Sequence, residues 1–112
     1  MEARGTSERR GTERAPVELW VTEEGEREAY YHRATSLSLG GLFLDRTLPH
    51  APGTVVQLKV RLGDTGPELF LSGEVVEATR ELGMGVRFRA LPPEPRRLLT
   101  EYLQRVTGER QG

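Results

Sequence analysis

The sequence predicts a mainly β domain, an antiparallel barrel or sandwich that is closed by one C-terminal helix. Several short runs alternate apolar and polar residues, and Gly- and Pro-rich turn signals separate them. After the last such run the apolar spacing changes to that of a helix. With 112 residues the chain has the usual length of one domain, so we expect one core between two layers.

Residues 1–15 hold almost no apolar side chains, and we expect them to form a flexible arm that cannot offset its own ordering entropy. The domain then covers residues 16–108, and 109–112 form a tail. Its first strand starts near Pro16, because apolar residues then occupy every second position through Val21.

The next runs predict the middle of the sheet. The stretch AYYHRATSLS is rich in β-branched and aromatic residues and predicts a second strand, and Gly40 and Gly41 mark the turn or bulge before the short run LFL. Residues 56–62 alternate cleanly and predict another strand. A short turn, GDTG, joins it to PELFLSGEVVEAT in a hairpin, in which Gly73 suggests a bulge.

The stretch ELGMGVRF predicts the last strand, with Met84, Val86 and Phe88 on one face. The helix follows, and Gly108 is expected to end it. Its apolar side consists of Leu98, Leu99, Tyr102, Leu103 and Val106. Two aromatic residues on strands, Trp20 and Phe70, are expected to pack in or near the core, and Arg87 and Arg89 are interpreted as a solvated edge.

The charge balance excludes several classes of partner. Sixteen basic and seventeen acidic residues give a net charge of −1, so we expect neither nucleic-acid binding nor a broad attraction to membranes. No apolar run is long enough to span a bilayer, and the first twenty residues are charged and contain no apolar core typical of a signal peptide, so we expect no membrane insertion and a cytoplasmic location.

Few residues could carry catalysis. The chain has two histidines, His32 and His50, which we interpret as isolated surface residues, and it has no cysteine. No Ser, His and acid form a known nucleophile pattern, and no His or Cys cluster has metal-ligand spacing. We therefore expect no enzyme, no metal site and no cofactor.

Two short motifs remain, each weak alone. Arg10 and Arg14 stand four residues apart before the first strand, with Arg9 as a basic neighbour, and SLSLGG closes the second strand. In this order, with PGTVVQLKVRL, GMGVRF and LPPEPRRLLTEYL downstream, the sequence resembles the PilZ domain family over residues 8–106. The resemblance implies a six-stranded, split-barrel-like β-barrel with a C-terminal helix.

The resemblance also implies a ligand, cyclic di-GMP. The family's motifs are RxxxR and D/N-x-S-x-x-G, and the second is matched by Ser38 and Gly41 but has Ser36 where Asp or Asn is expected. The implied ligand-binding residues are Arg9, Arg10, Arg14, Ser36, Ser38, Gly40 and Gly41. A guanidinium group can pair with guanine O6 and N7, stack on a base and offset a phosphate charge.

Two functions follow from this resemblance. The first is a receptor or adaptor whose N-terminal arm closes over cyclic di-GMP and changes the surface offered to a protein partner in motility, pilus or exopolysaccharide control. The second is an interaction module of the same fold that has lost the nucleotide through Ser36. We expect a monomer or a weak homodimer in either case.

Overall fold

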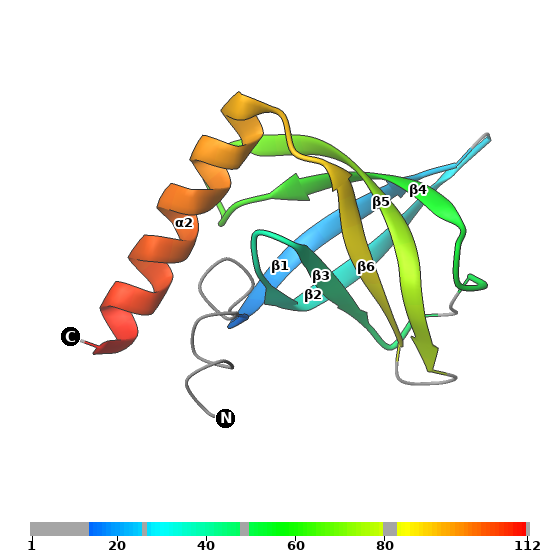
Figure 1. The fold of residues 1–112 in the computed structure, drawn as a ribbon, viewed down its shortest axis with the longest axis horizontal. Coiled ribbons are helices and arrows are strands. Elements are labelled where there is room, and N and C mark those ends of the chain that lie inside the picture. Colours follow the sequence, from blue (N-terminus) through cyan, green and yellow to red (C-terminus); the bar gives the residue numbers. More distant parts are fainter. Residues whose placement is uncertain (1–13, 26, 48–49, 80–82, 112) are drawn as a thin grey trace, which may run out of the picture.

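The computed structural model describes residues 14–25, 27–47, 50–79 and 83–111. The elements are β1 (Ala15–Glu24), β2 (Ala29–Leu37), β3 (Gly41–Asp45), β4 (Val55–Arg61), β5 (Glu68–Thr79), β6 (Gly83–Ala90) and α2 (Pro93–Gln111). The strands pair antiparallel in the order β1-β2-β3-β6-β5-β4, and β4 returns to β1 (Figure 1). This closed barrel confirms the mainly β prediction and excludes the sandwich.

Strand alternation builds the core. Most inward positions along the strands are apolar, and the side chains of Leu37, Leu42, Leu44 and Met84 are fully buried in the core. The predicted bulge at Gly73 is confirmed, because the β5–β6 register shifts between Ser72 and Gly73. Met84, Val86 and Phe88 all lie in the core as expected.

The prediction that Trp20 and Phe70 pack in or near the core is wrong. Trp20 is 62% exposed and Phe70 is 69% exposed. Each stands between two buried neighbours on its strand, and because successive side chains of a strand point to opposite faces, both must point out of the barrel. Their aromatic character suggested burial, whereas their position in the alternation decided the outcome.

Helix α2 stands beside one end of the barrel (Figure 1). Leu99 is fully buried, and Leu98, Tyr102 and Leu103 pack against the barrel core. The helix continues to Gln111, so the expectation that Gly108 ends it is wrong. No helix in the described part of the chain is long and apolar enough to cross a membrane.

Candidate functional site

The pairing of the first two strands brings Arg14 and Ser36 together. Pro16 lies opposite Ser36 in the β1–β2 register, so the residue just before β1 reaches the end of β2. Arg14 Nη1 donates a hydrogen bond of 3.0 Å to Ser36 Oγ, although the residues are 22 positions apart. Both are members of the predicted binding set, whereas Arg9 and Arg10 lie outside the described residues.

Ser38 shapes the β2–β3 turn beside this pair. Its side chain is buried, and its Oγ accepts hydrogen bonds from the backbone N–H groups of Gly40 at 3.1 Å and Gly41 at 3.2 Å. The backbone N–H of Ser38 donates to the Gly41 carbonyl at 2.9 Å. A hydroxyl that accepts hydrogen bonds from the backbone N–H groups of a turn stabilises the shape of that turn. It then has little hydrogen-bonding capacity left for solvent or a ligand.

Strand β6 explains the glycine at position 41 and contacts the backbone at position 40. A Cβ on Gly41 would clash with the backbone carbonyl oxygen of Val86. The Gly40 carbonyl accepts a hydrogen bond of 2.8 Å from the Phe88 N–H. Close packing against the neighbouring strand therefore requires Gly41, whether or not a ligand approaches the turn.

Arg87 is a further cation beside the turn that sequence reasoning treated as a solvated edge. It lies opposite Gly41 in the β3–β6 register and is exposed. Arg87 Nη2 lies 3.4 Å from Glu74 Oε1, a loose exposed pair that contributes little to stability. Only the strand order places Arg87 here, because β3 pairs with β6 rather than with the next strand in sequence.

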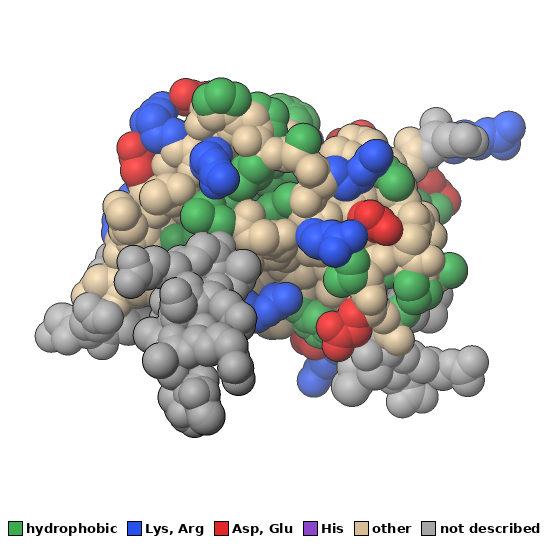
Figure 2. Space-filling view, viewed as in Figure 1, with side chains coloured by type: hydrophobic (Ala, Val, Ile, Leu, Met, Phe, Trp, Pro, Cys, Tyr) green, Lys and Arg blue, Asp and Glu red, His purple; other side chains and the backbone are tan. Residues whose placement is uncertain are grey.

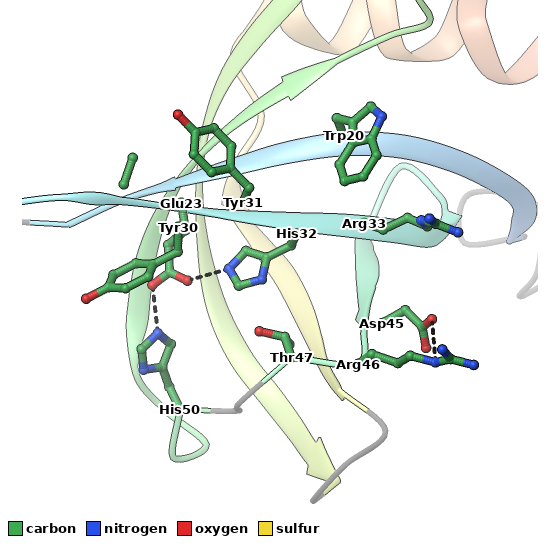
Figure 3. A pocket seen from close by; sticks show the side chains of 11 residues that line it. Trp20, Glu23, Tyr30, Tyr31, His32, Arg33, Asp45, Arg46, Thr47 and His50 are labelled. Carbon is green, nitrogen blue, oxygen red and sulfur yellow. Dashed lines mark hydrogen bonds and ion pairs between the residues drawn. The ribbon is translucent and has the colours of Figure 1, made fainter.

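A second polar cluster lies at the other end of β2. Glu23 is buried inside the barrel mouth, with Oε1 2.9 Å from His32 Nε2 and Oε2 2.7 Å from His50 Nε2 (Figure 3). An ionised carboxylate only accepts hydrogen bonds, so both imidazole rings donate to it. The interpretation of His32 and His50 as isolated surface residues is therefore wrong. Inward-facing Glu23 was the sequence signal for this cluster.

This cluster forms part of a pocket of about 910 Å³. The lining residues are Trp20, Glu23, Ala29, Tyr30, Tyr31, His32, Arg33, Asp45, Arg46, Thr47 and His50. The hydrogen bond of 2.9 Å that the Tyr30 hydroxyl donates to Glu28 raises the pKa of Tyr30. The pocket shares no residue with the predicted binding set.

Glu23 holds both histidines of the pocket. The Nε2 atom of each imidazole is hydrogen-bonded to Glu23 rather than to a serine or threonine hydroxyl. A hydrolytic triad needs that contact to a nucleophile. Among the described residues, no group of three or more His, Cys, Asp or Glu side chains is placed to hold a metal ion. The cluster instead ties the loop between β3 and β4 to the barrel.

Charge is spread over the surface. On the described part of the face in Figure 2, basic side chains are interspersed with acidic and apolar ones, which agrees with the net charge of −1. A broad basic field is therefore missing from this face, and anion binding there would depend on particular arginines.

Comparison with known proteins identifies a matching family and a shared fold. The sequence profile of the PilZ domain matches residues 8–105. Among solved structures, the chain is similar to YcgR in complex with c-di-GMP from Escherichia coli, with 18% identity, a TM-score of 0.74, and coverage of 88% of this chain and 46% of that one.

Two further structures share this fold. The Bacillus subtilis inhibitor of motility, MotI/DgrA, has 16% identity and a TM-score of 0.73 over 86% of this chain and 49% of that one. The K. pneumonia MrkH–c-di-GMP complex has 14% identity and a TM-score of 0.74 over 88% and 52%. The chain thus spans about half the length of these three proteins. No curated protein sequence matches it.

Proposed function

The chain belongs to the PilZ domain family, and on this premise we propose that it is a receptor for cyclic di-GMP. The observation that carries the proposal is the contact between Arg14 and Ser36, which holds a guanidinium group beside the Ser38–Gly41 turn. Two similar structures, YcgR and MrkH, are complexes with this nucleotide. The family match and the local geometry thus support the same ligand.

The residues of the proposed site have different roles in ligand binding. A guanidinium group has five N–H donors, so Arg14 keeps donors for a phosphate or a guanine edge after its bond to Ser36. Arg87 supplies positive charge from the opposite side of Gly41. Arg9 and Arg10 would add further guanidinium groups from the arm, while Ser38, Gly40 and Gly41 give the turn its shape.

We further propose that the nucleotide draws the N-terminal arm over itself and so changes the surface offered to a protein partner. Ordering a segment on binding costs about 2–5 kcal/mol of the gross interaction energy, so we expect an affinity in the micromolar range. The pathways suggested are motility, pilus or exopolysaccharide control. MotI, whose name records inhibition of motility, shares the fold.

A second candidate is an interaction module that binds no nucleotide. It is favoured by Ser36, which stands where the family pattern has a carboxylate or an amide, and whose hydroxyl is already bonded to Arg14. One hydroxyl accepts fewer guanine N–H donors than a carboxylate does.

Isothermal titration calorimetry separates the two candidates. The receptor proposal predicts heat with cyclic di-GMP, and a loss of roughly tenfold or more in affinity for Arg10→Ala and for Arg14→Ala. Arg27→Ala, which removes an exposed arginine near the β1–β2 hairpin, is the matched control and should bind like the parent. Cyclic di-AMP should bind far more weakly, because adenine lacks the O6 acceptor. Absence of heat with the parent protein favours the interaction module.

A further inference from the structure

Three large aromatic side chains lie exposed on the outside of the barrel. Trp20 on β1 is 62% exposed, Tyr31 on β2 is 76% exposed and Phe70 on β5 is 69% exposed. None belongs to the Arg14–Ser36 site. Aromatic residues and arginine are enriched in protein interfaces, so a group of them on one face indicates a site of protein–protein contact.

The strand register arranges these aromatics in rows across β2, β1, β4 and β5. One row runs Tyr31–Thr22–Lys59–Phe70, because each residue is the register partner of the next. This row has an aromatic residue at each end and two polar residues between them. Every member points away from the core, since the residues on either side of it in its strand are less exposed.

The adjacent row runs Arg33–Trp20–Arg61–Glu68. Arg33 pairs with Trp20, and Arg61 pairs with Glu68. Trp20 and Arg61 come together because they extend the Val21–Val60 pairing by one residue. The Arg33 guanidinium carbon lies 5.5 Å from the centroid of the Trp20 ring, and Arg61 Nη2 lies 2.9 Å from Glu68 Oε2.

Both rows belong to one continuous face. Figure 3 shows Trp20 and Tyr31 on the side of the β1–β2 ribbon opposite to Glu23 and His32, which point into the barrel. We call the outer face of these two rows the aromatic face. Two of its three cations have acidic partners within the chain, because Arg33 lies 3.6 Å from Glu18 and Arg61 is paired with Glu68, while Lys59 adds a further positive charge.

From these rows we propose that the aromatic face is the interface of a symmetric homodimer. A two-fold axis parallel to the strands and between β1 and β4 places β2 of one copy opposite β5 of the other, and β1 opposite β4. Each row then faces itself in reverse order. Tyr31 meets Phe70 of the second copy, which is an aromatic pair, and Arg33 meets Glu68, which is an ion pair.

The middle of the second row is complementary in the same way. Trp20 meets Arg61 of the second copy, which is a cation–π contact. The curvature of a barrel opens a gap toward the edges of such an interface, and the long side chains of Tyr31, Arg33 and Phe70 stand at those edges.

Sedimentation velocity of the full chain, from low micromolar to near-millimolar protein, tests the interface. The parent should show a reversible monomer–dimer equilibrium, and Phe70→Ser should raise the dissociation constant roughly tenfold or more. Val55→Ser removes another exposed apolar side chain outside both rows and should leave the equilibrium unchanged. A parent that stays monomeric, as it would if another protein or a membrane covers this face, overturns the proposal.

A charge exchange tests the facing pair itself. Arg33→Glu and Glu68→Arg should each weaken the dimer, because each places like charges opposite each other. The double variant reverses both partners and should recover most of the parent's association. If the dissociation constant of the dimer does not change in the single variants, or if the double variant associates as weakly as they do, the interface lies elsewhere. Arg14→Ala should leave the dimer intact, so this test is independent of nucleotide binding.

Discussion

Arg14 and Ser36 meet because β1 and β2 pair antiparallel, so that the start of one strand faces the end of the other. The hydroxyl at position 36 therefore has a role in the unliganded protein, which is to hold the guanidinium group of Arg14 near the turn. A serine hydroxyl accepts this hydrogen bond without adding a charge, so Arg14 keeps most of its capacity to bind an anion.

Ser36→Asp tests this residue in the nucleotide site. A carboxylate has two oxygens, one for Arg14 and one for a guanine N–H, so we predict tighter cyclic di-GMP binding by about 1–3 kcal/mol. Calorimetry measures the change, and Ser72→Asp, an outer position on β5, is the control. An unchanged affinity would mean that position 36 does not face the ligand.

At the scale of elements, two contacts hold the ends of β2 and β3. The β2–β3 turn is fixed by Ser38 and by close approach to β6, and the loop after β3 is tied to β1 and β2 through Glu23. The shape of the turn is therefore supported by contacts within the chain itself.

Gly41→Ala should destabilise the β3–β6 pairing. The new Cβ would clash with the Val86 carbonyl oxygen, and overpacking of this kind costs about 1–3 kcal/mol. Gly108→Ala is the opposite case, because its Cβ would meet nothing and alanine favours the helix by about 0.5–1 kcal/mol. Urea unfolding of both variants should give free-energy changes of opposite sign.

Glu23→Ala should also destabilise the fold. It leaves the buried His32 ring without its acceptor, which costs about 1–3 kcal/mol, and it releases His50 and its loop. The neighbouring Glu24→Ala changes an exposed carboxylate and should stay within about 0.5 kcal/mol of the parent in the same unfolding experiment. Equal effects of the two variants would show that the cluster adds no stability.

At the scale of the whole molecule, alternation and turn chemistry were sufficient to predict the strands, the helix and a core of either the barrel or the sandwich type. They could not predict which distant strands pair, so Arg87 beside Gly41 and the row from Tyr31 to Phe70 emerged only from the register. The motif residues Ser38 and Gly41 were predicted as binding residues, yet their contacts within the protein could not be read from spacing.

Ligand binding should stabilise the whole domain. A nucleotide concentration of about 100 Kd stabilises a protein by about 2.7 kcal/mol, which for a domain of this size raises Tm on the order of 10 °C. Thermal unfolding followed by circular dichroism should show this rise for the parent and a much smaller one for Arg14→Ala at the same nucleotide concentration. Equal shifts for both proteins would place the ligand away from Arg14.

The most direct measurement is a crystal structure of the chain grown with excess cyclic di-GMP. We predict nucleotide density against the Ser38–Gly41 turn, with the Arg14 guanidinium group on a phosphate or a guanine edge. A turn without nucleotide, with Arg14 still bonded only to Ser36, would contradict the receptor function and leave the barrel as an interaction module.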